Sequence, residues 1–156
     1  MKLILFFLLI SLSSCYLITG YKKRSFTYSN GPEQSHTLKL QVPRGYLDEK
    51  TTTDSTGNKE QVYRYINGMV FYVAYTPDTL KEFHPIEESR HVPLPHAQGG
   101  WIFKGVEKNN LFWREIRQDS LRFGYRYVPS ELEAKFDAAL NFNSLQKGKR
   151  KDNTGK

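Results

Sequence analysis

The side chains best suited to chemistry lie in two short stretches of the chain. One stretch ends in Cys15, the only cysteine among the 156 residues, which follows an apolar run. The other, "HPIEESRHVPLPH", places histidines and glutamates close together: His84, Glu87, Glu88, His91 and His96. A thiol is a nucleophile, while imidazole and carboxylate groups are ligands for zinc or copper. The first stretch therefore points to covalent modification, and the second to a metal.

The histidine spacing argues against a bound metal. It matches none of the common metal-site signatures, and the histidines are separated by prolines at positions 85, 93 and 95. Prolines favour an extended course, so ligands five residues apart would lie about 17 Å from each other unless the chain folds back. We expect His84, His91 and His96 to lie in different surroundings, with no metal and no other cofactor. An anchored metal-binding protein that uses these three residues remains the alternative.

The residues before Cys15 have the three parts of a secretory signal peptide. Lys2 supplies a positive charge, Leu3–Ile10 is apolar throughout, and serines follow at positions 11, 13 and 14. A charged start, an apolar centre and a small-residue end are typical of an export signal. A transmembrane anchor is the other interpretation, but a span needs roughly 20 apolar residues, and serines interrupt this run after Ile10.

Leu12-Ser13-Ser14-Cys15 resembles the lipobox of bacterial lipoprotein precursors, in which leucine and two small residues precede an invariant cysteine. The resemblance implies that residues 1–14 are a signal peptide and that a peptidase cuts before Cys15. It further implies that the Cys15 thiol carries a diacylglycerol, with membrane lipid as its partner. The mature protein would then be lipid-anchored in the cell membrane or outer membrane. With no second cysteine, the exported chain can form no internal disulfide.

The net charge of +7 is concentrated at the ends of the chain. Lys2 contributes +1, and the tail "KGKRKDNTGK" contributes +4, which leaves +2 for residues 15–146. Because the tail has no apolar residue to bury, we expect 147–156 to be disordered. We assign residues 15–24 to a lipidated tether and 25–146 to one globular domain. Export and the nearly balanced domain argue against nucleic acid as a partner.

No catalytic motif is evident. The chain has no Gly-x-Ser-x-Gly elbow and no Gly-rich phosphate loop. Cys15 is committed to the anchor. We therefore expect a non-enzymatic envelope protein that has a binding or structural role, with another envelope protein as a possible partner. A small hydrolase of unrecognised type is a further alternative.

The first half of the domain reads mainly as strands. "HTLKLQV" alternates, so His36, Leu38, Leu40 and Val42 should share one face. Residues 47–60 are polar and rich in threonine, and we expect a mobile loop there. Asn67-Gly68 predicts a two-residue hairpin turn that pairs Tyr65 with Val70 and lies centrally in the sheet. A further helical turn or two is predicted within residues 76–83, followed by an irregular crossing to Gly100.

The second half predicts a meander and a closing helix. A hairpin turns near residues 108–110, with Trp101 and Trp113 expected in the core, and "LRFGYRYV" alternates so that Leu121 and Tyr127 share a face. Ser130 and Glu133 could form a capping box, and an apolar stripe follows to about Leu145. The fold class is therefore α+β: an antiparallel β-sheet of about six to seven strands with one C-terminal helix packed on it.

The two ends of the domain resemble the PsbP-like fold. That group also opens with an amphipathic strand that ends near Pro-x-Gly, as "SHTLKLQVPRGY" does here, and closes with a strand that leads into a helix. The resemblance covers only these two ends and rests on the pattern of elements. It implies a fold and no activity.

Overall fold

The computed structural model describes residues 20–29, 35–77 and 93–148, with the backbone alone for 145–148. The predictions for the signal peptide, for Cys15, for His84 and His91, for the helical turns after Pro77 and for residues 149–156 lie outside the described residues.

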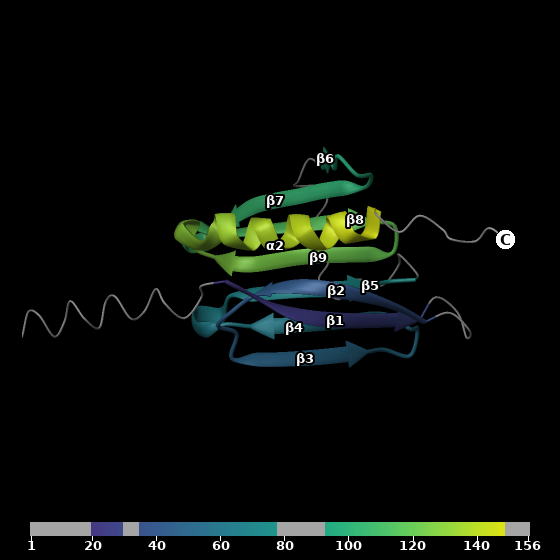
Figure 1. Ribbon diagram of the computed structural model, residues 1–156. Helices are drawn as coiled ribbons and strands as arrows, with labels where there is room; N and C mark the ends of the chain where they lie inside the picture. The colour runs from purple at the N-terminus through teal and green to yellow at the C-terminus, as the bar shows by residue number, and fades with distance from the viewer. Residues whose placement is uncertain (1–19, 30–34, 78–92, 149–156) are drawn as a thin grey trace, which may run out of the picture.

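Within the described residues, the strands form two antiparallel sheets (Figure 1). The small sheet pairs β1 (Tyr21–Ser29) with β2 (Ser35–Pro43). The large sheet has the order β3-β4-β5-β9-β8-β7-β6. Its strands are β3 (Asp48–Thr53), β4 (Lys59–Arg64), β5 (Val70–Tyr75), β6 (Leu94–Pro95), β7 (Trp101–Glu107), β8 (Leu111–Gln118) and β9 (Leu121–Val128). The helix α2 (Ser130–Gly148) follows β9 directly.

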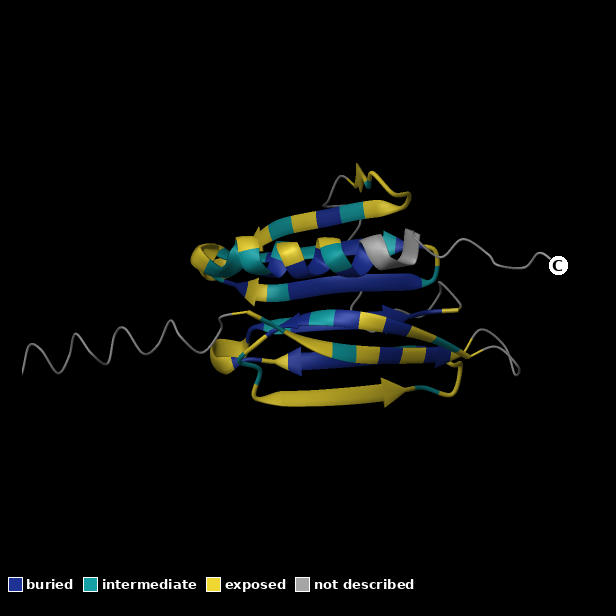
Figure 2. Cartoon of the chain, in the orientation of Figure 1, coloured by how far each residue is buried: buried dark blue, intermediate teal, exposed yellow. Residues whose placement is uncertain are grey.

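The small sheet and α2 cover the same face of the large sheet, and the main core lies between these layers (Figures 1 and 2). Phe26 and Leu40 come from the small sheet, Phe71 and Phe123 from the large sheet, and Phe136 from α2; each is at most 1% exposed. Aromatic rings make much of the contact, for example Tyr28 on Tyr75, with ring centroids 4.5 Å apart. The predicted α+β class with an antiparallel sheet and a C-terminal helix is confirmed.

Several local predictions hold. In β2 the even-numbered residues from Leu38 to Val42 are buried, while Thr37 and Lys39 are exposed. Strands β7, β8 and β9 form the predicted meander, and the first of its turns lies at Lys108–Asn110. The helical stripe packs on the core as expected, because Phe136, Ala139 and Leu140 are all 0% exposed. Ser130, however, donates a hydrogen bond to the neighbouring Glu131 carboxylate (3.4 Å), and no bond to Glu133 is seen within the described residues.

The prediction of a long mobile loop over residues 47–60 is wrong. Asp48–Thr53 forms the edge strand β3, which pairs with β4 along its whole length. All six residues of β3 are exposed. Because neither face is buried, the alternation of apolar and polar residues that marks most strands is missing. The threonines supply the strand propensity, and the charged residues suit a free edge.

The predicted register of the central hairpin is wrong by one residue. The turn has three residues, Ile66–Gly68. Val70 therefore pairs with Arg64, and not with Tyr65 as predicted. Asn67 and Gly68 both have left-handed backbone, and Tyr65 N–H donates to Met69 O (2.9 Å) across the turn. The same Asn-Gly pair thus serves a longer loop, which the dipeptide alone does not exclude.

Two further corrections concern the ends of elements. Tyr127 does not share a face with Leu121, because the pairing of β8 with β9 shifts between Phe112 and Arg114. Tyr127 takes a positive φ of 60°, which is typical of a bulge, and it turns outward while Val128 is buried. The folded domain also begins earlier than predicted. Residues 21–24, assigned to a tether, belong to β1, because their backbone pairs with residues 40–43 of β2.

Candidate functional site

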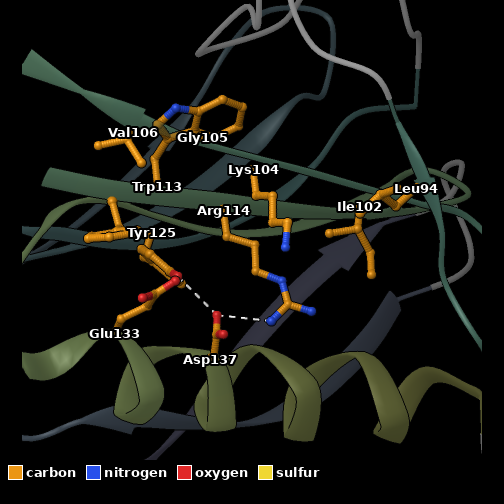
Figure 3. A pocket seen from close by; sticks show the side chains of 11 residues that line it. Leu94, Ile102, Lys104, Gly105, Val106, Trp113, Arg114, Tyr125, Glu133 and Asp137 are labelled. Atoms are coloured by element: carbon orange, nitrogen blue, oxygen red, sulfur yellow. Dashed lines mark hydrogen bonds and ion pairs between the residues drawn. The ribbon is translucent and has the colours of Figure 1, made fainter. Parts of the chain in front are cut away.

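A hollow lies between β7 and α2, and we call it the β7 groove (Figure 3). Its volume is about 420 Å³. It is lined by residues from β6, β7, β8, β9 and α2: Leu94, Ile102, Lys104, Gly105, Val106, Phe112, Trp113, Arg114, Tyr125, Glu133 and Asp137. The groove combines apolar walls with charged groups of both signs, as ligand-binding sites commonly do.

The groove exists because the sheet is wider than the layer that covers it. Helix α2 packs on β2, β8 and β9, whereas β7 extends beyond the helix. The side chains of Ile102, Lys104 and Val106 point to the helix side of the sheet, in register with Ile116, Arg114 and Phe112 of β8. Val106 is 56% exposed. The sequence pattern in β7 is therefore that of a core-facing strand whose covering layer is incomplete.

An ion-pair network closes the floor of the groove. Arg114 Nη1 lies 2.9 Å from Asp137 Oδ1, and the Tyr125 hydroxyl donates to the same oxygen at 2.9 Å (Figure 3). Burial, followed by the charge of Asp137, raises the pKa of Tyr125 well above its usual value. Arg114 therefore sits beside a carboxylate that already neutralises it, while its Nε is buried and has no hydrogen-bond partner among the residues that the structure describes. This network fixes the helix on the sheet and leaves Lys104 as the exposed cation of the groove.

Counting only the described residues, the outer edge of β7 is unpaired from Phe103 to Glu107. In the described residues, only Trp101 and Ile102 are paired on that side, with the two-residue strand β6. Leu94, Trp101 and Val106 are large apolar residues that are 43%, 51% and 56% exposed. Trp101 and Val106 lie at opposite ends of β7 and, because side chains alternate along a strand, on opposite faces of it, with Val106 on the helix side. The opposite edge, β3, carries Asp48, Glu49 and Lys50, charges of the kind that discourage strand addition. The two edges of the sheet thus differ in their capacity to accept another strand.

The prediction that both tryptophans lie in the core is half wrong. Trp113 is 6% exposed and packs with Phe103 in a small second cluster. Trp101 is exposed, because the edge strand places it beyond the covered part of the sheet. Sequence alternation could not separate the two cases, since both positions fit a strand.

A buried polar network that the sequence analysis missed lies on the face of the sheet opposite α2. Glu115 is fully buried, and its carboxylate accepts hydrogen bonds from the Tyr72 hydroxyl (2.5 Å) and from Arg117 Nε (2.6 Å). Tyr72 reaches Glu115 by lying across β9 at Gly124, where a Cβ would come within 2.0 Å of the tyrosine ring. The glycine in "RFGYRYV" was the available signal, since a glycine inside a strand often marks close approach.

This network is suited to stability rather than to turnover. Burial, and then the neighbouring Glu115 carboxylate, raise the pKa of Tyr72 well above its ordinary value, so the phenol stays protonated and donates. Both oxygens of Glu115 are satisfied by charge-assisted or short hydrogen bonds. With Glu115 at 0% and Tyr72 at 2% exposure, a substrate has no access to either group.

Of the three histidines proposed as metal ligands, only His96 is described. Its Nδ1 accepts a hydrogen bond from the Gln98 backbone N–H (3.4 Å) and lies 3.3 Å from the Gln118 amide nitrogen. Residues 84 and 91 lie outside the described part, so the prediction that His84, His91 and His96 lie in different surroundings stays untested, as does the alternative of a metal site. Elsewhere, within the residues that the structure describes, no group of three potential ligands is close enough to hold a metal ion.

Among the described residues, no helix combines the length and the apolar composition that a membrane span requires. Comparison of the chain with protein-family models, with curated proteins and with solved structures found no match.

Proposed function

We propose that the chain is a non-enzymatic envelope lipoprotein, held to the membrane through acylated Cys15, that binds an extended segment of another envelope protein. The partner segment would pair with the open edge of β7 and place its side chains in the β7 groove. In this mode the main chain supplies hydrogen bonds, and alternate side chains supply specificity.

The observation that carries the proposal is the edge of β7, which beyond Ile102 is unpaired within the described residues, together with the exposed Leu94 and Val106 that line the groove and the exposed Trp101 on the other face of the strand. Exposed tryptophan is enriched among the residues that dominate binding energy at interfaces. An edge strand that presents both unpaired backbone and apolar side chains is a template for pairing. Lys104 and Glu133, at the rim of the groove, add one charge of each sign for orientation.

A site-specific cross-link tests the proposal. A photo-reactive amino acid at position 104, whose side chain faces the groove, should yield one adduct of defined mass when the anchored protein is irradiated in its membrane. Val106→Lys should abolish that adduct, because a charge replaces the exposed apolar contact. Thr52→Lys, a matched change on the opposite edge strand β3, should leave it unchanged.

The adduct must also map to an extended segment of a second protein. A link only to the chain's own residues, or an adduct that survives Val106→Lys, would contradict the proposed binding mode. Intact mass and thermal unfolding of each variant establish that the fold is retained. Because position 106 is 56% exposed, we expect its unfolding temperature to change little.

A further inference from the structure

One end of the molecule, where β1 begins, gathers several turns. The start of β1, the loop from β2 to β3, the turn from β4 to β5 and the turn from β7 to β8 all lie there, on the left in Figure 1. The strand registers agree, since Tyr21 pairs with Pro43, and Asp48 with Arg64. We call this the β1 end.

Two of these turns hold large apolar side chains out into solvent. Leu47 and Ile66 are 73% and 56% exposed, and Leu47 is the most exposed of the large apolar residues described. The Leu47 N–H donates to Arg64 O (2.7 Å), which fixes the β2–β3 loop beside the end of β4. Ile66 belongs to the three-residue turn that follows β4. Backbone hydrogen bonds therefore fix both loops at the β1 end, where the two side chains are exposed to solvent.

A basic hollow of about 400 Å³ lies at the same end, lined by Lys22, Arg44, Gly45 and Tyr46. The Lys22 ammonium lies 5.5 Å from the centre of the Tyr46 ring, and Arg44 Nε donates to the Tyr21 carbonyl (3.1 Å). Within the described residues neither cation has a carboxylate partner. Their neighbours Arg24 and Arg64 differ, because each forms an ion pair at 3.0 Å, with Glu49 and Asp48 respectively.

The position of this end relative to Cys15 is limited by the chain itself. Five residues lie between Cys15 and Tyr21, and each of the six steps along the chain extends it by at most about 3.6 Å. An acyl group on Cys15 would therefore keep the start of β1 within roughly 20 Å of the bilayer. The other end of the sheet, where β3 ends at Thr53, lies one strand length farther from Cys15 than the β1 end does.

We propose that the β1 end is a membrane-contacting surface that rests on an anionic bilayer. Leu47 and Ile66 enter the interfacial layer, and Lys22 and Arg44 bind headgroup phosphate in the hollow between them. This inference depends on the anchoring in the proposed function and deepens it. The two acyl chains of a diacylglycerol give stable attachment, and basic residues near an anionic surface add to it and favour one orientation of the domain on the bilayer. Glu107 and Glu131 also lie at this end and would repel anionic lipid. The attraction of anionic headgroups is therefore confined to the hollow.

Lysine labelling of the acylated protein tests the proposal. The protein is reconstituted into vesicles of phosphatidylcholine, with or without phosphatidylglycerol, and each lysine is acetylated and followed by mass spectrometry. Lys22 should react about fivefold more slowly on the anionic vesicles, and high salt should remove the difference. Lys50 on β3 and Lys104 in the β7 groove, both exposed, should react equally on the two.

Two variants separate apolar contact from general attraction. Leu47→Gln with Ile66→Gln should lose most of the protection of Lys22. Leu94→Gln, which changes an apolar residue that is 43% exposed and lies outside this end, should keep it. All three positions are exposed, so we expect the variants to fold. An unchanged unfolding temperature checks this.

Three results would overturn the inference. The first is equal labelling of Lys22 on both vesicles while the intact mass shows an acylated Cys15; the anchor then stands without this surface. The second is equal protection by soluble polyphosphate, which would assign the hollow to a free anionic polymer. The third is a mature chain without an acyl group, which removes the anchoring along with the inference.

Discussion

At the scale of single residues, Asp54 organises the turn between β3 and β4. Its Oδ1 accepts hydrogen bonds from Thr56 Oγ1 (2.7 Å), Thr56 N–H (2.9 Å) and Asn58 N–H (3.0 Å), and Oδ2 accepts one from the Asn58 amide (2.9 Å). The bond from the Thr56 side chain, with those from Asn58 and the backbone, lowers the pKa of Asp54 from 3.8 to about 2. Hydrogen bonds to the ionised form therefore hold this turn together.

Asp54→Ala should lower the unfolding temperature at pH 7. Because the folded pKa lies below the unfolded one, the stabilisation is complete above about pH 4 and is lost as the pH falls through about 2. Thermal unfolding of wild type and variant between pH 2 and 7 should show two curves that converge at the acid end. Asp48→Ala, whose carboxylate pairs with the exposed Arg64, is the control and should show a smaller difference. Parallel curves would contradict this account of Asp54.

At the scale of elements, glycines allow aromatic rings to lie flat on the sheet. The Tyr72 ring covers Gly124, and the Trp113 indole covers Gly105, where an added Cβ would come within 2.7 Å of the indole nitrogen. Gly124 has no positive φ, so its backbone would accept any residue. The glycine at this position is therefore required by the ring above it, which joins β5 to Glu115 on β8.

Gly124→Ala should destabilise the domain by about 3 kcal/mol or more, because the new methyl group overlaps a fully packed ring. In a Tyr72→Ala background the same substitution should cost less than about 1 kcal/mol, since the ring is absent. Urea unfolding of the four proteins gives the coupling energy. Equal costs in both backgrounds would show that the effect lies in the backbone of β9 and not in the contact with Tyr72.

Strands β3 and β7 lie toward opposite edges of the large sheet and differ in composition and exposure. Strand β3 is exposed throughout and charged at its first three positions, whereas β7 is apolar at Trp101, Phe103 and Val106. The β7 groove follows from this difference, because α2 reaches β8 and stops short of β7. A longer or shifted helix would have buried Ile102 and Val106 and left no groove.

At the scale of the whole molecule, the two proposed binding surfaces lie at different places on the large sheet, one at an end of its strands and one along an edge. The membrane surface is placed at the β1 end, next to the proposed anchor, and the β7 groove runs along the edge strand on the far side of the sheet from β3. A protein bound at the β7 edge would approach from the side and leave the hollow lined by Lys22 and Arg44 free. This arrangement is compatible with simultaneous attachment to a bilayer and to a partner.

Cys15→Ser should prevent acylation and the cleavage that the lipobox resemblance implies. A hydroxyl does not replace the thiol as the acceptor of the lipid, so the chain should keep residues 1–14 and lack the mass of the acyl groups. Intact mass spectrometry of the protein from fractionated membranes measures both effects. If the variant has the same mature mass as wild type and remains in the membrane fraction, the anchor proposal is wrong.

The sequence by itself determined the order and type of most elements. Alternation in β2 and in β7 to β9, and the helical stripe around Phe136, predict the antiparallel sheet with its closing helix, because these patterns report which side of each element is buried. The alternation of apolar and polar residues gave no useful signal where a strand has no buried face, or where buried residues are polar. Strand β3 has no buried face to mark it, and the row from Tyr72 to Glu115 is polar yet buried.

Only the tertiary structure decided where these residues meet. The β7 groove brings Lys104, Arg114 and Asp137 together from three elements, and the β1 end joins Lys22 to Arg44 and Leu47 to Ile66. Each residue alone resembles an ordinary surface or strand position. Their proximity depends on strand order, on register and on how far α2 extends across the sheet, and these follow from the packing of the whole core rather than from any local pattern.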